Sequence, residues 1–465
     1  MKDAVRILSR AAAKCHPLAS VDPNILHAKA PRILFSGQSG FTVVPALSSG
    51  TDTSPRSTRK AAFQAVTAAR ALDPKASREF VLDGFEAPSE LRAASEGATL
   101  AMYAYPYKAP APAHSLTHSA AGDALASLHF SHGCRVADAQ NLAKTLMSVP
   151  SNIMTPSAFS KKAEELLHGL SGVTCTVRDE AWIRQENMNL LLAVSAGSVP
   201  GSARFLEMTF SPPAYDPASG ETLALLGKGV TFDSGGLSLK PSAGMHLMKG
   251  DMGGAAIVLA AFYAHVSSLD AQNSSKRIVA CIPLCENMVS DQATRPGDVV
   301  TSRNGKTVEI DNTDAEGRLI LADAISYMCQ EYSPRRLVEF STLTGAISIA
   351  LGSRYSGLFT RDDALADDLI AAGLETGDEL FWRMPMDQEY LELLKSDVAD
   401  FKNAGGREAG SSSAAVFLQQ FVPEGVSYAH VDIAGVMHAK GTTDAIQAGM
   451  TGRPTRALLQ FLEKS

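Results

Sequence analysis

Acidic side chains are concentrated in one short segment of the chain, and two other segments each carry an acid next to a predicted strand or helix. DNTDAEGRL, residues 311–319, holds Asp314 and Glu316 just before an apolar helical pattern. Asp233 follows a predicted buried strand, and Asp251 precedes another apolar helical stretch. Because ligands of open α/β sheets gather at the carboxyl ends of the strands, we expect these four acids to converge on one spot.

Converged carboxylates need compensating positive charge. At an effective dielectric of ~20, one like-charge pair at ~4 Å costs about 4 kcal/mol. A pair of divalent cations would balance the four acids and would activate water for hydrolysis. Oxygen ligands accept Mg²⁺, Mn²⁺ or Zn²⁺, and Lys228 offers an unusual nitrogen ligand. The alternative is that each acid is only a helix cap or a surface charge.

Other catalytic and binding motifs fail on inspection. SRNGKT, residues 302–307, is similar to a phosphate-binding loop, but that pattern needs a glycine where Val300 stands. DNTDAEG departs from a calcium loop because its glycine comes one position late. HExxH and GxSxG are absent from the sequence, so a serine-hydrolase elbow is unsupported. His430 lies in an apolar strand pattern, and we interpret it as a core histidine rather than a ligand.

Composition and charge restrict the class of protein. The 465 residues are 45% hydrophobic and 20% charged, with a net charge of −7, as in ordinary globular proteins. No Lys/Arg-rich run stands out, so nucleic acid is an unexpected partner. No run of about 18 apolar residues appears, so no membrane association is expected. The six cysteines lack CxxC spacing, which indicates reduced thiols and a cytoplasmic protein, although the basic first 20 residues leave organellar import open.

The apolar patterns indicate an α/β protein. Residues 1–134 are expected to form a small N-terminal α/β domain, and residues 135–170 a connecting helical segment. Residues 171–465 are expected to form a larger catalytic domain with a central mixed sheet flanked by helices, because near-continuous apolar runs are typical of strands buried on both faces. Ser89 and Thr155 are predicted helix N-caps. The predicted strands of the catalytic domain are VTCTVR, LLLAVSA, TLALLG, RIVACIPL, RLVEFSTLT and YAHVDIAG.

The segment NTDAEGRL, residues 312–319, resembles the signature of the leucyl aminopeptidase family, two-metal enzymes with an α/β catalytic domain. The resemblance continues in the family's order over nearly all of residues 140–465, whereas the first 130 or so residues resemble only the variable N-terminal domain of such enzymes. The other segments that carry it are GKGVTFDSGGLSLKP (227–241), MKGDMGGAA (248–256), CENM (285–288), RPGDVV (295–300), STLTGA (341–346), FKNAGGREAGSSSAA (401–415) and GMTGRPTRAL (449–458).

The resemblance implies two divalent metal ions per subunit, Zn²⁺ and/or Mn²⁺. One ion would be held by Asp233, Asp314 and Glu316. The other would be held by Lys228, Asp233, Asp251 and Glu316, so that Asp233 and Glu316 bridge the two ions.

The resemblance also implies catalytic roles for Lys240 and Arg318. Lys240 would polarise the scissile carbonyl and steady the developing oxyanion. Arg318 would hold a bicarbonate ion that relays protons, which fits the lack of a spare His or Glu for a general base in the motifs. The alternative for Arg318 is a salt bridge to a nearby acid. Asp311 is an addition to the family's motif, and we expect it to lie outside the shell of metal ligands.

A substrate pocket follows from the same resemblance. Thr342, Leu343 and Gly345 would border the substrate backbone. Methionines make an adaptable apolar wall, which suits leucine-like side chains, and core packing is the alternative for the two methionines concerned. The residues implied to line the pocket for the first side chain are Met248, Gly345, Ala434 and Met437.

The predicted function is a metal-dependent aminopeptidase that releases N-terminal leucine and other apolar residues from peptides, by attack of water activated by two metals. By resemblance we also expect a homohexamer whose active sites face an interior cavity, which would restrict substrates to short peptides. Two alternatives remain: a nucleic-acid-binding or scaffold protein that retains the fold, and a metal enzyme that acts on phosphate esters.

Overall fold

The computed structural model describes residues 3–8, 32–35, 40–44, 54–72, 77–83, 85, 87–107, 112–119, 122–272, 274–443 and 445–464. The chain divides into two compact units. The first unit comprises Met1–Asn141, Thr376–Asp378 and Ala439–Gly449, and the second comprises Leu142–Glu375, Glu379–His438 and Met450–Ser465.

The first unit is a small α/β fold whose sheet has the strand order β2-β3-β1-β4-β5. Helices α2 and α3 pack on each other, and Phe63, Phe80 and Leu91 lie in the shared core. The elements are β1 (Asp3–Leu8), β2 (Arg32–Phe35), β3 (Gly40–Val44), α2 (Pro55–Leu72), β4 (Arg78–Asp83), α3 (Pro88–Met102), β5 (His114–His118) and α4 (Ala124–Ser148), the last of which continues into the second unit.

The prediction of Ser89 as an N-cap is wrong. Helix α3 already begins at Pro88, and Ala87 occupies the cap position without a side-chain hydrogen bond. Proline is well suited to the first helical position because it has no N–H to satisfy, so the helix starts one residue before the serine. The prediction for Thr155 is confirmed: its hydroxyl oxygen accepts a hydrogen bond from the Ala158 N–H at 3.3 Å, and α5 begins at Pro156.

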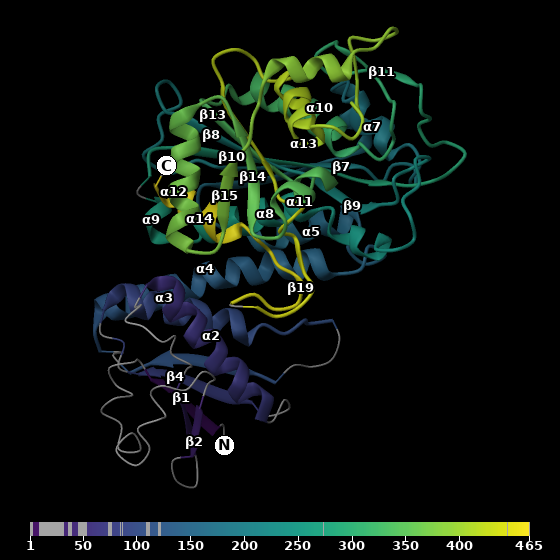
Figure 1. Ribbon diagram of the computed structural model, residues 1–465. Coiled ribbons are helices and arrows are strands. Elements are labelled where there is room, and N and C mark those ends of the chain that lie inside the picture. The colour runs from purple at the N-terminus through teal and green to yellow at the C-terminus, as the bar shows by residue number, and fades with distance from the viewer. Residues whose placement is uncertain are drawn as a thin grey trace. The chain divides into compact units, whose positions relative to one another are not determined.

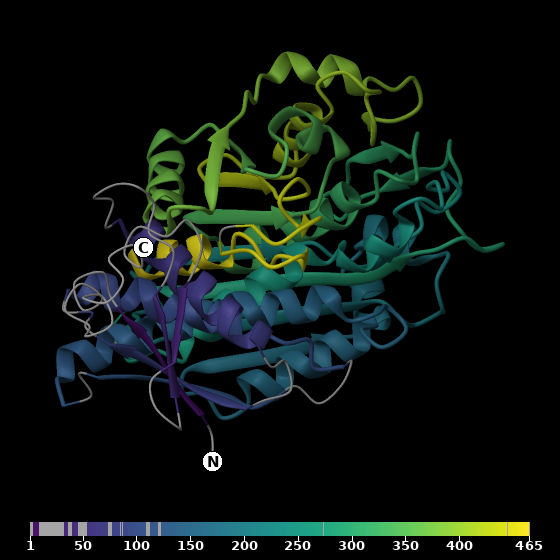
Figure 2. The same cartoon turned by 60° about the horizontal axis from the view of Figure 1, so that its bottom comes forward.

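The second unit is built on a mixed sheet of order β15-β14-β17-β13-β8-β10-β7-β6, with β9 beside the far end of β10. Strands β17, β13, β8 and β10 run parallel, and the outer pairs β17/β14 and β10/β7 are antiparallel. Helices α5, α8 and α14 cover one face, and α7, α10 and α13 lie over the other (Figures 1 and 2). The predicted mixed sheet flanked by helices is therefore confirmed.

The strands of the second unit are β6 (Val173–Arg178), β7 (Arg204–Phe210), β8 (Thr222–Gly227), β9 (Gly229–Asp233), β10 (Arg277–Asn287), β11 (Val299–Thr301), β12 (Thr307–Glu309), β13 (Arg336–Ser341), β14 (Tyr355–Thr360), β15 (Leu380–Arg383), β16 (Phe401–Lys402) and β17 (Ser427–Asp432). The helices are α5 (Pro156–Leu167), α6 (Glu180–Gln185), α7 (Asn189–Ser195), α8 (Gly253–Val266), α9 (Leu269–Gln272), α10 (Gly317–Tyr332), α11 (Gly345–Leu351), α12 (Asp363–Thr376), α13 (Gly410–Gln419) and α14 (Thr455–Lys464), with 3₁₀ helices η3 (Met245–Gly250) and η4 (Gln388–Leu394). The short strands β18 (His438–Ala439) and β19 (Gly449–Met450) pair with each other.

Helix α8 is a strongly apolar helix of the second unit. By length and composition the stretch Met245–Val266 would be able to cross a membrane, but 78% of its most apolar window is buried inside the protein. It packs against β8, β13 and α14, as a core helix does.

The predicted strand LLLAVSA is wrong, because these residues form α7. A short apolar run does not by itself distinguish a buried strand from a buried helix. The carboxylate of Asp323 on α10 favours the helix here, because its Oδ2 accepts hydrogen bonds from the Leu190 and Leu191 N–H groups at 2.8 and 3.2 Å. These two donors belong to the first turn of α7, where backbone N–H groups lack partners within the helix.

Replacing Asp323 with alanine tests this anchoring. Asp323 is fully buried, and its other oxygen accepts a hydrogen bond from the Arg303 N–H at 2.8 Å. Three backbone N–H donors, two of them buried, would lose their acceptor, so we expect the free energy of unfolding to fall by about 3 kcal/mol, measured by urea denaturation. Glu331→Gln, on the exposed end of the same helix, is the control and should change stability by less than about 0.5 kcal/mol. A loss below about 1 kcal/mol in Asp323→Ala would contradict the anchoring role.

Candidate metal centre

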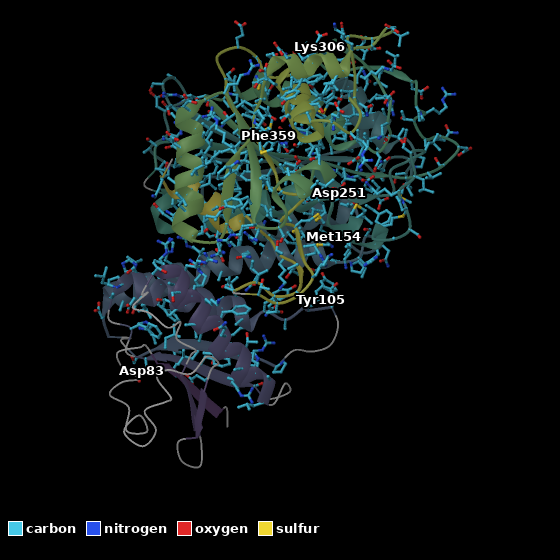
Figure 3. The ribbon with its side chains drawn as sticks, in the orientation of Figure 1. Asp83, Tyr105, Met154, Asp251, Lys306 and Phe359 are labelled. Carbon is cyan, nitrogen blue, oxygen red and sulfur yellow. The ribbon has the colours of Figure 1, made fainter. Side chains whose placement is uncertain are left out.

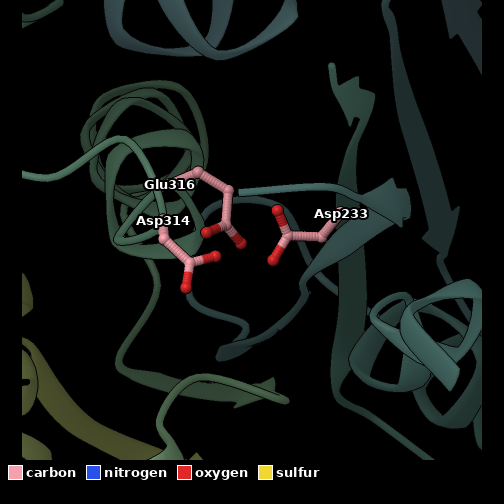
Figure 4. A group of neighbouring side chains, drawn as sticks. All are labelled: Asp233, Asp314 and Glu316. Carbon is pink, nitrogen blue, oxygen red and sulfur yellow. The ribbon is translucent and has the colours of Figure 1, made fainter. Parts of the chain in front are cut away.

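Three acids from two separate loops meet at the carboxyl ends of the central strands. Asp233 is the last residue of β9, and Asp314 and Glu316 stand in the loop that leads into α10. One carboxylate oxygen of each lies within 4.8 Å of the others, and Figure 4 shows the three side chains pointing toward one another. Asp233 and Glu316 are buried, and Asp314 is partly exposed. This spacing allows all three to bind one cation.

Lys228 connects this group to the fourth acid, Asp251. The Lys228 Nζ lies 2.8 Å from Asp251 Oδ2 and 2.7 Å from Glu316 Oε1, and all three side chains are buried. Asp251, labelled in Figure 3, directly follows η3 and precedes α8. It does not cap that helix, since the cap position is Met252 and no side-chain cap bond forms. The structure thus brings all four predicted acids into one centre.

Two glycines allow this approach. A Cβ atom at Gly254, in the first turn of α8, would lie 1.9 Å from the Phe340 carbonyl oxygen and 2.8 Å from the Lys228 backbone nitrogen. A Cβ at Gly317 would lie 2.7 Å from the Lys228 Cε atom. The contacts at Gly254 are with backbone atoms, which cannot move aside, so glycine there lets α8 begin directly beside the end of β8. The contact at Gly317 is with the end of the Lys228 side chain, so glycine there leaves space for that side chain.

Lys240 completes the charged group. Its Nζ lies 2.7 Å from Asp233 Oδ2 and also pairs with Asp314 Oδ1. Arg318, in the first turn of α10, is buried, with 8% of its surface exposed. Its Nη1 donates no hydrogen bond, and the guanidinium forms no ion pair, with any residue that the structure describes. The salt bridge considered as the alternative for Arg318 is therefore not found among these residues.

Burial and mutual repulsion make the four acids difficult to ionise together. Burial raises the pKa of Asp233 to about 6, with a further contribution from the charge of Glu316, and burial raises the pKa of Asp251 well above its usual range. Burial opposes the charged form of Lys228, but the carboxylates of Asp251, Glu316 and Asp233 outweigh it and raise the lysine pKa. Burial similarly opposes ionisation of Glu316, but Lys228 and Lys240 outweigh it and lower the pKa of that carboxyl.

The donor set fits divalent cations. Asp251 Oδ2, Asp314 Oδ1 and Glu316 Oε1 are buried and accept no hydrogen bond of ordinary geometry from any described residue, although each lies beside a lysine ammonium group. Buried carboxylate oxygens are normally hydrogen-bonded or bound to metal. Four carboxylates and the amine of Lys228 together offer oxygen and nitrogen donors of the kinds that Zn²⁺ and Mn²⁺ accept.

Neutral side chains that the sequence analysis had not singled out hold the acids in place. Asn287, at the end of β10, donates from Nδ2 to Asp233 Oδ1 at 2.9 Å and to the Thr313 carbonyl at 3.0 Å. Asn403 hydrogen-bonds the backbone of the loop at 311–315. Both lie in quoted motifs, CENM and FKNAGG, but spacing alone gives no indication of which backbone atoms an amide will reach.

The residues predicted to border the substrate backbone lie in the segment that follows β13. Thr342 follows β13, and its hydroxyl donates to Asp251 Oδ1 at 2.6 Å while its carbonyl accepts from Lys228 Nζ at 3.0 Å. The Leu343 N–H donates to Asp432 Oδ1 at 3.1 Å. Thr342 therefore supports a candidate metal ligand, a role that the resemblance had not implied.

The remaining predicted pocket residues occupy neighbouring loops. Gly345 opens α11, Met248 is half-buried in η3, and Ala434 and Met437 follow β17. The Met437 methyl group would lie 2.9 Å from a Cβ at Gly250, so Met437 packs against the end of η3.

Asp311 lies outside the group of acids. Its Oδ1 is 3.9 Å from Lys402 Nζ, and about half of its side chain is exposed.

Comparisons with known proteins show the family to which the chain belongs. The profile of the cytosol aminopeptidase family, catalytic domain, matches residues 141–459. The cytosol aminopeptidase of Dictyostelium discoideum is 44% identical over 341 residues, which span 72% of this chain and 64% of that protein. The cytosol aminopeptidase of Homo sapiens is 43% identical over 380 residues, which span 80% of this chain and 70% of that protein.

Solved structures of the same kind resemble the whole chain. The bottromycin maturation enzyme BotP in complex with Mn is 33% identical, with a TM-score of 0.87 over 100% of this chain and 99% of that one. A mutant of tomato leucine aminopeptidase is 28% identical, with a TM-score of 0.84 over 100% of this chain and 94% of that one. The predicted family, α/β fold and hydrolase class are thus confirmed, and the chain belongs to the cytosol aminopeptidase family of metal-dependent aminopeptidases.

Proposed function

We propose that the protein releases N-terminal leucine and other apolar residues from peptides with the help of two divalent metal ions. The observation that carries this proposal is the convergence of Asp233, Asp251, Asp314 and Glu316 around Lys228. The proposed catalytic domain is residues 171–465, with residues 135–170 as a helical connector and residues 1–134 as a separate N-terminal domain.

We propose the metal ligands from the geometry of the acids and the membership of the family together. Asp233, Asp314 and Glu316 would hold one ion, and Lys228, Asp251 and the two bridging acids Asp233 and Glu316 the other. Zn²⁺ and Mn²⁺ both suit these donors, and a similar solved structure is described as a complex with Mn. When bound, such a pair of ions activates water as a nucleophile and polarises the attacked carbonyl.

The protein's own groups would position the peptide and stabilise charge. Asp251, held by the Thr342 hydroxyl, is suited to receive the free α-amino group of the substrate. Lys240, whose pKa the surrounding carboxylates raise against the opposing effect of burial, stays charged at neutral pH and would stabilise the oxyanion. Burial lowers the pKa of Arg318 to about 10, so its guanidinium also remains charged and is suited to hold bicarbonate.

The residue types at the proposed pocket positions suit apolar side chains. Met248 lies in η3, Ala434 and Met437 follow β17, and thioether side chains adapt to aliphatic groups of varied shape. Gly345 lies open at the start of α11, with no atom within 4 Å of an added Cβ, which leaves room for the substrate backbone. Peptides are the proposed substrates.

Assembly and location are proposed from the family alone. We propose a homohexamer in the cytoplasm, in line with relatives named cytosol aminopeptidase, with import through residues 1–20 still open because residues 9–31 lie outside the described part. The net charge of −7 gives no support to nucleic-acid binding. No specific observation among the described residues favours a scaffold protein or an enzyme that acts on phosphate esters.

Removing one ligand tests the metal centre. We expect Asp314→Ala to lower leucine-amide hydrolysis by at least about 100-fold, since residues that merely support ligands already change activity by about 10–100-fold. A chelator should abolish wild-type activity, and added Mn²⁺ or Zn²⁺ should restore it. Asp311→Asn, three residues away and outside the group of acids, is the matched control and should keep near wild-type activity. Undiminished turnover by Asp314→Ala would defeat the proposal.

A second prediction separates Lys240 from the metal ligands. Lys240→Met should lower kcat by about 100–1000-fold, the usual effect of losing one oxyanion-stabilising group. Its metal affinity should be equal or higher, because a competing positive charge beside Asp233 and Asp314 is lost. Weaker metal binding together with an unchanged kcat would contradict the assignment.

The oligomeric state is directly measurable. Sedimentation of the intact chain should give a mass of about six times 49.1 kDa. A stable monomer with full activity would contradict the proposed hexamer and would leave the metal centre unaffected.

A further inference from the structure

We infer that Asn403 is a positioning residue of the metal centre: its side-chain amide fixes the shape of the loop that presents Asp314 and Glu316, and so sets the affinity of the site for divalent cations. This inference rests on the proposed metal centre. It concerns a neutral residue that touches neither the proposed ions nor the substrate pocket.

The amide of Asn403 is fully engaged by one short loop. Its Oδ1 accepts hydrogen bonds from the Asp311 and Asn312 N–H groups at 2.9 and 3.1 Å. Its Nδ2 donates to the Asn312 and Ala315 carbonyls at 2.7 and 3.3 Å. An asparagine amide offers two acceptor sites and two donors, and all of them are directed here at the backbone of residues 311–315.

These bonds reach both ends of the segment that carries the acids. Asp311 and Asn312 begin it, and Ala315 is directly followed by Glu316. Between them, the Asn312 side chain accepts a hydrogen bond from the Asp314 N–H at 2.8 Å. Asn403 therefore constrains the backbone immediately before and after Asp314.

The register of a small sheet places Asn403 beside the loop. Strand β16 runs parallel to β12, with Phe401 opposite Val308 and Lys402 opposite Glu309. The Asn403 N–H continues this ladder by donating to the Glu309 carbonyl at 2.9 Å. The acidic loop directly follows β12. The pairing of β16 with β12 therefore places the Asn403 side-chain amide beside the start of that loop.

The opposite side of the loop is held by the segment that contains Lys240. Thr313 Oγ1 donates to the Gly235 carbonyl at 2.7 Å, and the Ser238 N–H donates to Thr313 Oγ1 at 2.7 Å. The loop is thus clamped between this segment and Asn403. Loss of one side would free the carboxylates of Asp314 and Glu316 to move apart, which their mutual repulsion favours.

Asparagine is the side chain that the position requires. Asn403 has no exposed surface, so glutamine would be one methylene too long for a closed site. Aspartate would keep the two acceptor bonds but would set an oxygen against the Asn312 and Ala315 carbonyls. It would also add a negative charge near four acids.

The test measures metal binding by the intact chain. We expect Asn403→Ala to bind Mn²⁺ about 10–100-fold more weakly than the wild type, as is usual for residues that orient metal ligands, with a smaller rise in Tm on addition of Mn²⁺. Asp323→Ala is the matched control, because it removes a buried side chain that also bonds backbone N–H groups next to α10 but lies away from the acids. It should lower the Tm of the metal-free protein and leave Mn²⁺ affinity unchanged.

A purely structural role would give a different result. If Asn403→Ala lowered the metal-free Tm but bound Mn²⁺ with wild-type affinity, the inference would be overturned. If this variant does not accumulate as folded protein, Asn403→Ser, which also leaves the charge of the centre unchanged, takes its place with the same two outcomes. Leucine release by the wild type is assayed separately. If the wild type binds Mn²⁺ but releases no leucine, the proposed activity is rejected. The comparison of Mn²⁺ affinity between the wild type and Asn403→Ala still tests the role of Asn403.

Discussion

The mutual repulsion of four converging carboxylates, three of them buried, is the constraint on which the rest of the structure depends. At an effective dielectric of ~20 each close pair costs about 4 kcal/mol, and burial removes the water that would screen it. The fold tolerates this because Lys228 and Lys240 lie among the acids. The same unfavourable charge density suits the site to divalent cations, so the feature that costs stability is also the one on which the proposed function depends.

A rigid framework is needed to keep like charges together. The central strands β8, β10 and β13 are almost entirely buried, and they end where the acids begin. Helices α8 and α10 start at the same edge, and Gly254 allows α8 to approach the backbone of Phe340 and Lys228. Because a packed interior relaxes little, the ends of these elements cannot separate under the repulsion. The packing of the whole second unit therefore fixes the positions of the carboxylate oxygens of the four acids.

The sequence allowed the charged part of this centre to be predicted, and the reason is local. Asp314 and Glu316 stand two positions apart, and Asp233 and Asp251 each adjoin a strongly apolar element, so residue type and context sufficed. LLLAVSA was misassigned as a strand because the N–H groups of the first turn of α7 donate to Asp323, which lies more than 130 positions further along the chain. Long-range bonds of this kind leave no periodic signal in the segment that receives them.

The neutral supports escaped prediction for a related reason, and their neutrality is itself required. Asn287 and Asn403 each use one amide to join two segments, and such contacts are specified by three-dimensional position, not by spacing. Charged alternatives would be worse at both places. A carboxylate would add to the repulsion and could not donate to carbonyls, whereas an ammonium group could not accept from N–H groups and would compete with the cations. Only an amide both donates and accepts without changing the charge of the centre, which is why two of them stand immediately behind its acids.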